Sequence, residues 1–195
     1  MKFRECFEYI AGRWTNELIV TSAGNSSEMW WEITQDTERV FYLEASMSLA
    51  SLFASGIALG LPGKDVWVFS GDGAFCMNPG MLMVERQMNL SNLTHFLVSN
   101  RCYGSTYEVN LPNASSNDYA AMARASGLER VYTFNTMDAL KSEFDIAVLK
   151  PGHTFIVLEV EPVGKKLKEP PMDGPEMKYR FGRYVERLAG VRLFD

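Results

Sequence analysis

The sequence VWVFSGDG at residues 66–73 decides the fold, together with HFLVSN at residues 95–100. Each stretch starts as a short apolar run, which predicts a buried strand, and each leads to a polar side chain, Asp72 or Asn100. Between them, Asn-Pro-Gly at residues 78–80 is expected to open one crossover helix. Two strands joined in this way are expected to be parallel, with their C-terminal ends at one edge of the sheet. Asp72 and Asn100 should therefore converge where open α/β sheets bind ligands.

Asp72 and Asn100 together predict a magnesium site. Mg²⁺ prefers oxygen ligands, and here a carboxylate and an amide can supply two of them. A main-chain carbonyl just past Asn100, phosphate oxygens and water would complete the octahedron. Gly71 and Gly73 would let the main chain approach phosphate groups, and the helix that follows would point N–H groups at them. Taken alone, Gly-Asp-Gly is more typical of a simple turn.

Short β-rich runs alternate with helical patterns along the chain. Strands are expected at residues 17–22, 39–43, 65–70, 94–99, 130–134 and 154–160, with helices near 27–34, 47–59, 80–90, 118–125, 137–148 and 177–188. Phe3, Phe7 and Ile10 stand at helical spacing and add a helix at the N-terminus. The alternation predicts an α/β fold, a six-stranded, mostly parallel sheet with helices on both faces.

Composition limits the classes of partner and organisation. The chain has 195 residues, of which 47% are hydrophobic, so it can bury the core of one domain, with residues 163–195 as a C-terminal tail and helix. A net charge of −5 without a basic stripe argues against nucleic acid. The apolar run at residues 47–62 contains serines and is too short for a membrane span. Three separated cysteines and no signal peptide favour a reducing cytoplasm.

The spacing from Gly-Asp-Gly to Asn100 resembles the bipartite motif of thiamine diphosphate-dependent enzymes. The resemblance extends to ASMSLAS at 45–51, GIALGLP at 56–62, NLTH at 92–95 and YGST at 103–106. Across roughly residues 17–162, the chain resembles the decarboxylase family that includes the β subunit of sulfopyruvate decarboxylase and the C-terminal half of phosphonopyruvate decarboxylase. The resemblance implies the thiamine diphosphate-binding fold, with thiamine diphosphate and Mg²⁺ as cofactors.

By resemblance, Gly24, Asn25 and Ser26 fall in a loop that hydrogen-bonds the diphosphate. The alternative is that Ser26 or Ser27 simply caps the N-terminus of a helix, and both roles can hold together. Met47 matches the bulky aliphatic residue that supports the bent form of the cofactor, although a methionine at such a position is more often core. Ser46 stands where the family usually has glycine, which makes its backbone contact to the pyrimidine less certain.

The resemblance places further residues around the metal and the substrate. Gly71, Asp72, Gly73 and Ala74 form the first half of the motif, and Ala74 lacks the hydroxyl that is common there. The expected metal ligands are Asp72 from the first half and Asn100 with the main-chain carbonyl of Cys102 from the second, and Tyr103 and Gly104 are expected beside the cofactor. Arg101, Ser105 and Thr106 are candidate substrate residues. Arg101 could equally meet an anionic substrate or cover the loop.

The family's catalytic glutamate is not expected in this chain. It belongs to a pyrimidine-binding domain, so the resemblance implies a pyrimidine-binding α subunit, an assembly of α2β2 or larger, and an interface beside the cofactor. Glu44 precedes Met47 within the same domain and is not assigned that role. His95 is expected to be a structural histidine within a strand, and His153 carries no assignment.

The expected activity is non-oxidative decarboxylation of a 2-oxo acid to an aldehyde and CO₂, with sulfopyruvate and phosphonopyruvate as first candidates. One alternative is an acetolactate-synthase-like carboligase, and another is a scaffold that binds the cofactor without activity. A 2-oxo acid:ferredoxin oxidoreductase β subunit is disfavoured, because Cys6, Cys76 and Cys102 lack cluster-binding spacing.

Overall fold

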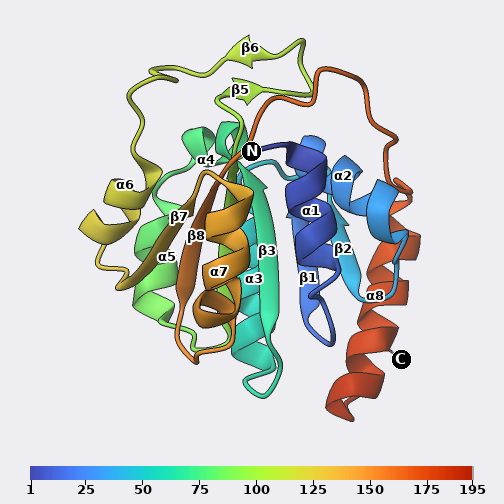
Figure 1. Ribbon diagram of the computed structural model, residues 1–195. Coiled ribbons are helices and arrows are strands. Elements are labelled where there is room, and N and C mark those ends of the chain that lie inside the picture. Colours follow the sequence, from blue (N-terminus) through green and yellow to red (C-terminus); the bar gives the residue numbers. More distant parts are fainter. Residues whose placement is uncertain (195) are drawn as a thin grey trace.

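Six parallel strands form the central sheet of the protein in the computed structural model, which describes residues 1–194 (Figure 1). The strands are β1 (Leu18–Ser22), β2 (Val40–Leu43), β3 (Val66–Gly71), β4 (Leu93–Ser99), β7 (Arg130–Phe134) and β8 (Thr154–Glu159). Their order is β2-β1-β3-β4-β8-β7, and every neighbouring pair is parallel. The expected six-stranded sheet is confirmed, and β3 and β4 end side by side.

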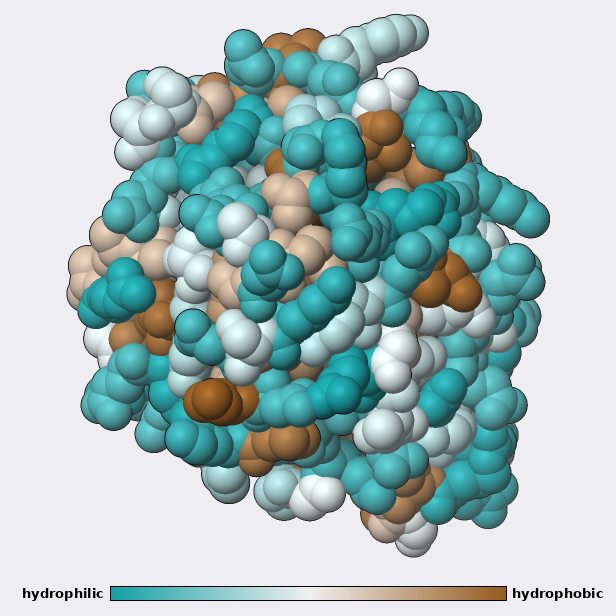
Figure 2. Space-filling model, in the orientation of Figure 1, coloured by the Kyte–Doolittle hydropathy of each residue, from teal (hydrophilic) through white to brown (hydrophobic). Residues whose placement is uncertain are grey.

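Helices cover both faces of the sheet, as expected. One face carries α1 (Phe3–Ala11), α2 (Asn25–Thr34) and α7 (Met137–Val148), and the other carries α3 (Ala50–Gly60), α4 (Asp72–Met77), α5 (Met81–Met88), α6 (Tyr119–Ala125) and α8 (Gly174–Ala189). Strands β1, β3 and β4 are buried on both faces because helices cover them from both sides, and this explains their unbroken apolar runs. The side of the molecule shown in Figure 2 is mainly hydrophilic, with scattered apolar side chains.

Two helix starts at the C-terminal edge of the sheet differ from the expected ones. Helix α3 begins at Ala50 rather than Met47, because Ser48 has a left-handed backbone (φ 78°) that an α-helix cannot contain. Helix α4 is an additional helix that starts at Asp72, so α4 and α5 fill the crossover where one helix was expected. Met47 therefore lies in a connecting loop and Asp72 on the first turn of a helix.

A two-stranded antiparallel ribbon lies beyond the sheet edge at which β3 and β4 end (Figure 1). It consists of β5 (Cys102–Tyr103) and β6 (Val109–Asn110), which the sequence did not predict. Since β5 starts just after Asn100, the ribbon fixes the path of the chain past that residue.

The C-terminal segment returns to the sheet after crossing the surface. Helix α8 starts three residues before the expected Met177, with Asp173 as a side-chain cap that accepts a hydrogen bond from Glu176 N–H. The ring of Phe181 packs edge-on against Phe41, with centroids 5.4 Å apart. Treating residues 1–195 as one domain stays an interpretation. Among residues 1–194, no helix combines the length and the apolar character needed to cross a bilayer.

Candidate functional site

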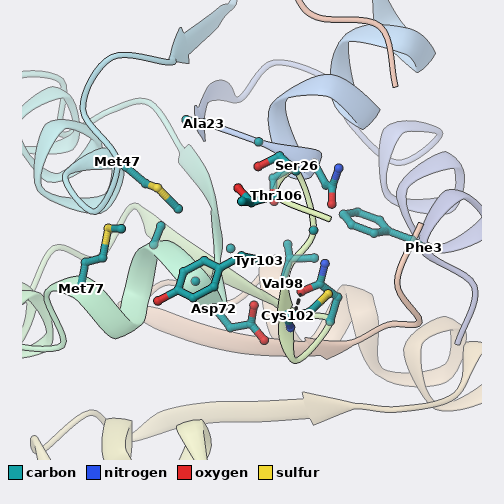
Figure 3. Close-up of a pocket in the computed structure, with 18 residues that line it drawn as sticks. Phe3, Ala23, Ser26, Met47, Asp72, Met77, Val98, Cys102, Tyr103 and Thr106 are labelled. Carbon is teal, nitrogen blue, oxygen red and sulfur yellow. Dashed lines mark hydrogen bonds between the residues drawn. The ribbon is translucent and has the colours of Figure 1, made fainter. Parts of the chain in front are cut away.

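A pocket at the C-terminal ends of β1, β3 and β4 gathers nearly all of the candidate residues (Figure 3). The expected residues that line it are Gly24, Asn25, Ser26, Met47, Gly71, Asp72, Gly73, Ala74, Asn100, Cys102, Tyr103, Gly104, Ser105 and Thr106. Segments far apart in sequence thus converge, as the parallel order of the strands requires. Ser46 and Arg101 are not among the lining residues.

Asp72 is the candidate metal ligand with the clearest environment in the pocket. It follows β3 directly and is 1% exposed, and its Oδ2 accepts a hydrogen bond of 2.8 Å from the backbone N–H of Arg101. Burial raises the pKa of the Asp72 carboxyl to about 6, although the hydrogen bond from the Arg101 backbone N–H works in the opposite direction. A buried carboxylate that is costly to ionise gains strongly from a cation placed against it.

Asn100 and Cys102 complete a set of oxygen donors. Asn100 is buried after the last residue of β4, and its Oδ1 accepts a hydrogen bond of 3.2 Å from Cys102 N–H, which leaves a second lone pair. Burial raises the pKa of the Cys102 thiol to about 11, so its sulfur stays protonated and is a poor metal ligand. A carboxylate, an amide oxygen and a main-chain carbonyl are typical donors for Mg²⁺ rather than for zinc.

The N-terminus of α2 supplies the opposite wall of the pocket. The helix starts at Asn25 after Gly24, whose φ of 95° favours glycine, and no side chain caps it. The alternative of a Ser26 or Ser27 cap is therefore wrong, since both lie inside the helix and Ser27 Oγ instead pairs with Thr21 Oγ1 at 2.8 Å. The N–H groups of the first turn, which have no side-chain cap, are donors of the kind that can bind an anion such as phosphate.

Gly104 brings the two walls together. A Cβ at this position would lie 1.9 Å from Asn25 Oδ1 and 2.8 Å from Asn100 Nδ2, both far inside van der Waals contact. Asn25 Oδ1 is buried and has no hydrogen-bond partner among the described residues, while its Nδ2 donates to Glu28 at 2.9 Å. Gly73 similarly faces the ring of Tyr103, since a Cβ there would lie 2.8 Å from Cδ1. The pocket thus has tight glycine contacts and one unused acceptor oxygen, which suits a cation or a hydrogen-bond donor in the site rather than the phosphate oxygens themselves.

Apolar side chains close the rest of the pocket (Figure 3). Met47 and Met77 lie on one side and Phe3 on the other, with the ring of Tyr103 between them. Met77, Phe3, Ala23 and Val98 also line the pocket and were not predicted. Ala23 and Val98 adjoin predicted segments, so their sequence position could have indicated them, whereas nothing in the sequence ties Phe3 to this site.

Arg101 does not enter the pocket, and the substrate-binding position assigned to it is not supported. Its guanidinium forms an ion pair with Glu159 at 2.5 Å, donates to the carbonyls of Ala114 and Asn117 at 3.2 and 2.6 Å, and lies 5.0 Å from the centre of the Tyr119 ring. These acceptors turn the side chain away from the pocket, so its hydrogen bonds hold the loop of residues 111–118 in place. Its backbone remains at the site through the bond to Asp72.

Ser46 also lies outside the lining of the pocket. Its carbonyl accepts a hydrogen bond of 3.1 Å from Leu49 N–H, which forms part of the turn that leads into α3. The backbone of Ser46 therefore shapes the loop that carries Met47.

The chain is similar to known proteins of one family, which has a C-terminal TPP binding domain. The family described as thiamine pyrophosphate enzyme, C-terminal TPP binding domain, matches residues 23–160. Sulfopyruvate decarboxylase subunit beta of Methanocaldococcus jannaschii is 30% identical over 88% of this chain and 89% of its own. The subunit of the same name from Methanothermobacter thermautotrophicus is 29% identical over 93% of this chain and 94% of its own.

The fold recurs in a larger protein of known structure. Benzoylformate decarboxylase from Polynucleobacter necessarius superposes with a TM-score of 0.68 at 18% identity, over 87% of this chain and 34% of that chain. The chain therefore corresponds to about one third of that protein, and at this identity the likeness concerns the fold alone.

Proposed function

Because this chain belongs to the thiamine pyrophosphate enzymes, with a domain of the C-terminal TPP-binding type, we propose that it is the diphosphate- and Mg²⁺-binding subunit of a non-oxidative 2-oxo acid decarboxylase. The observation that carries the proposal is the convergence of Asp72, Asn100 and the N-terminus of α2 on one pocket. Thiamine diphosphate, when bound, supplies the electron sink that allows a 2-oxo acid to lose CO₂.

Each wall of the pocket has a distinct task in this proposal. Asp72, the amide oxygen of Asn100 and the carbonyl of Cys102 hold Mg²⁺, and the first-turn N–H groups of α2 hold the diphosphate. Met47 supports the bend of the cofactor from the loop before α3. Ala74 lines the pocket without a hydroxyl, so the phosphates depend on backbone donors on that side.

The relatives are named as beta subunits, which implies an alpha partner subunit. We place the partner's pyrimidine-binding domain, with its activating glutamate, over the open side of the pocket. Leu49, Phe53 and Met77 are 44%, 38% and 57% exposed on this side of α3 and α4, which suits an apolar interface. An assembly of α2β2 or larger would bury these side chains and complete the site.

Gly104 provides a test of the cofactor site. Gly104→Ala is expected to lower the affinity for thiamine diphosphate in Mg²⁺ buffer by about tenfold or more, because the new methyl group displaces Asn25 and Asn100, and overpacking of this kind costs about 1–3 kcal/mol. Gly56→Ala is the matched control, since a Cβ there meets nothing within 4 Å. Calorimetric titration gives the affinities, and equal values for the two variants would remove Gly104 from the site.

The substrate class is tested in the complex with the partner. We propose that it is a small 2-oxo acid with a second anionic group, with sulfopyruvate and phosphonopyruvate as first candidates. CO₂ release and aldehyde formation are expected from one of them in preference to pyruvate. A product that contains a second carbonyl substrate would instead identify a carboligase, and no CO₂ from any 2-oxo acid would favour a scaffold.

Arg101 gives this assay an internal check. Ser105 and Thr106 line the pocket, whereas the guanidinium of Arg101 is turned away, so the cationic contacts to a dianion are assigned to the partner. Arg101→Ala should therefore change KM equally for dianionic substrates and for pyruvate. A larger rise in KM for dianionic substrates than for pyruvate would show that Arg101 contacts the substrate.

A further inference from the structure

Three buried side chains, Ser70, His95 and Glu85, form a hydrogen-bonded network next to the pocket, and a fourth, His153, lies in contact with Glu85. Ser70 Oγ lies 2.5 Å from His95 Nε2, and His95 Nδ1 lies 3.0 Å from Glu85 Oε1. His153 Nε2 lies 3.1 Å from the other oxygen of Glu85. The exposed fractions are 1% for Ser70, 0% for Glu85 and His95, and 6% for His153. The network links β3, β4 and the start of β8 to α5, and a structural role for His95 alone does not explain its extent.

Donor and acceptor roles follow from the chemistry of the carboxylate. An ionised carboxylate can only accept, so His95 carries its proton on Nδ1 and its Nε2 is free to accept from the Ser70 hydroxyl. Burial works to raise the pKa of the Glu85 carboxyl, but the two imidazoles outweigh it and hold this pKa below its usual range. Ser70 is thus held in one orientation by a buried, charge-assisted chain of hydrogen bonds.

The same sequence of partners occurs in serine hydrolases, where the serine attacks a substrate. Here Ser70 is 1% exposed and points at a fully buried ring, so no acyl group can reach it. Its position along the chain suggests a different role. Ser70 directly precedes Gly71 and Asp72, and Gly71 N–H in turn donates to Ser22 Oγ at 3.2 Å.

We propose that Ser70, His95 and Glu85 are positioning residues that fix the end of β3 so that the Asp72 carboxylate meets the metal, with His153 as a second brace on Glu85. This inference rests on the proposed function, because it requires Asp72 to be a metal ligand. Without the network, the C-terminal end of β3 loses the side-chain contacts that hold Ser70, the residue two positions before Asp72. Catalytic geometry tolerates shifts of only about 0.5 Å.

The test compares Ser70→Ala with Ser55→Ala in the full-length chain. Ser55 is also fully buried, and its Oγ donates one hydrogen bond of 2.8 Å, to Ser51 O within α3. Both variants should lower Tm, and Ser70→Ala should lower it more, because it also leaves the buried Nε2 of His95 without a partner. Only Ser70→Ala should raise the Kd for thiamine diphosphate in Mg²⁺ buffer, by about threefold to tenfold. Glu85→Gln, which keeps an acceptor for His95, should raise it less than Glu85→Leu.

A spectroscopic readout is independent of the cofactor. The chain has two histidines, so ¹⁵N spectra of the imidazoles can be assigned with one His153→Gln variant. His95 should carry a proton on Nδ1, with an Nε2 resonance that shifts in Ser70→Ala and stays unchanged in Ser55→Ala. An Nε2–H tautomer, or covalent labelling of Ser70 by a fluorophosphonate, would overturn the inference.

The inference and the proposed function can fail separately. If Asp72→Ala loses the cofactor while Ser70→Ala keeps wild-type affinity, the network is merely structural and the inference is overturned. If Asp72→Ala keeps wild-type affinity, the proposed metal site itself is overturned, and the network loses its role with it.

Discussion

Replacing Asp72 with alanine is expected to abolish Mg²⁺-dependent binding of thiamine diphosphate, with an affinity loss of at least about 100-fold. Asp72 is the one carboxylate among the described residues that line the pocket, so its removal leaves Mg²⁺ with neutral protein ligands only. Asn100→Ala should weaken binding less, since it removes a neutral ligand. Calorimetric titration in buffers with Mg²⁺ and with a chelator measures both effects.

Two further variants separate charge from folding. Asp138→Ala removes an exposed carboxylate from the first turn of α7 and should leave the affinity unchanged. Asp72→Asn keeps the size of the side chain but should still lose Mg²⁺-dependent binding. Wild-type affinity in Asp72→Ala would remove Asp72 from the metal site.

Asp72→Asn should be more stable than the wild type when no cofactor is present. Burial raises the folded-state pKa of Asp72 to about 6, above the 3.8 of the unfolded chain, so stability is lost as pH rises from about 4 to about 6 and is not regained above that. At neutral pH, Asp72→Asn removes this cost and should raise Tm by a few degrees. A binding residue that destabilises the empty protein is typical of functional sites.

The second large effect is dependence on the partner subunit. The purified chain is expected to release CO₂ from a 2-oxo acid at least about 1,000-fold more slowly than the mixture with the partner, because the proposal assigns the activating carboxylate to the other subunit. We do not assign this role to Glu44, which lies beside Ser27 and Gly24 at the start of α2 and whose pKa is raised by burial. CO₂ release by each subunit and by the mixture measures the effect.

The control for this measurement uses the same partner preparation. A mixture that contains the Asp72→Ala chain should be inactive, which excludes a contaminating enzyme as the source of CO₂. Sedimentation of the active mixture should give two copies of each subunit or a multiple of that. Steady turnover by this chain alone would contradict the division of the site between two subunits.

Much of the fold could be predicted because its signals are local. Strands β3 and β4 at the centre of the sheet are apolar on both faces, and this pattern is typical of parallel strands that helices cover on both sides. The positions of Asp72 and Asn100 followed from topology alone, since parallel neighbours end at the same edge. The glycines and the α2 N-terminus reached the pocket for the same reason.

The remaining details depend on contacts between distant segments. The left-handed backbone of Ser48 moves the start of α3, and a serine gives no signal of it in the sequence. Arg101 turns toward Glu159, which lies 58 residues later in the chain. Phe3 reaches the pocket because α1 packs on the sheet beside α2. Such effects arise from tertiary packing, which residue patterns do not encode.

A crystal structure of the chain with its partner, thiamine diphosphate and Mg²⁺ tests the central claim most directly. The account predicts Mg²⁺ bound by Asp72, the amide oxygen of Asn100 and the main-chain carbonyl of Cys102, with the diphosphate at the N-terminus of α2 and a partner glutamate at the pyrimidine. Diphosphate bound elsewhere, or a metal held by other residues, would contradict it.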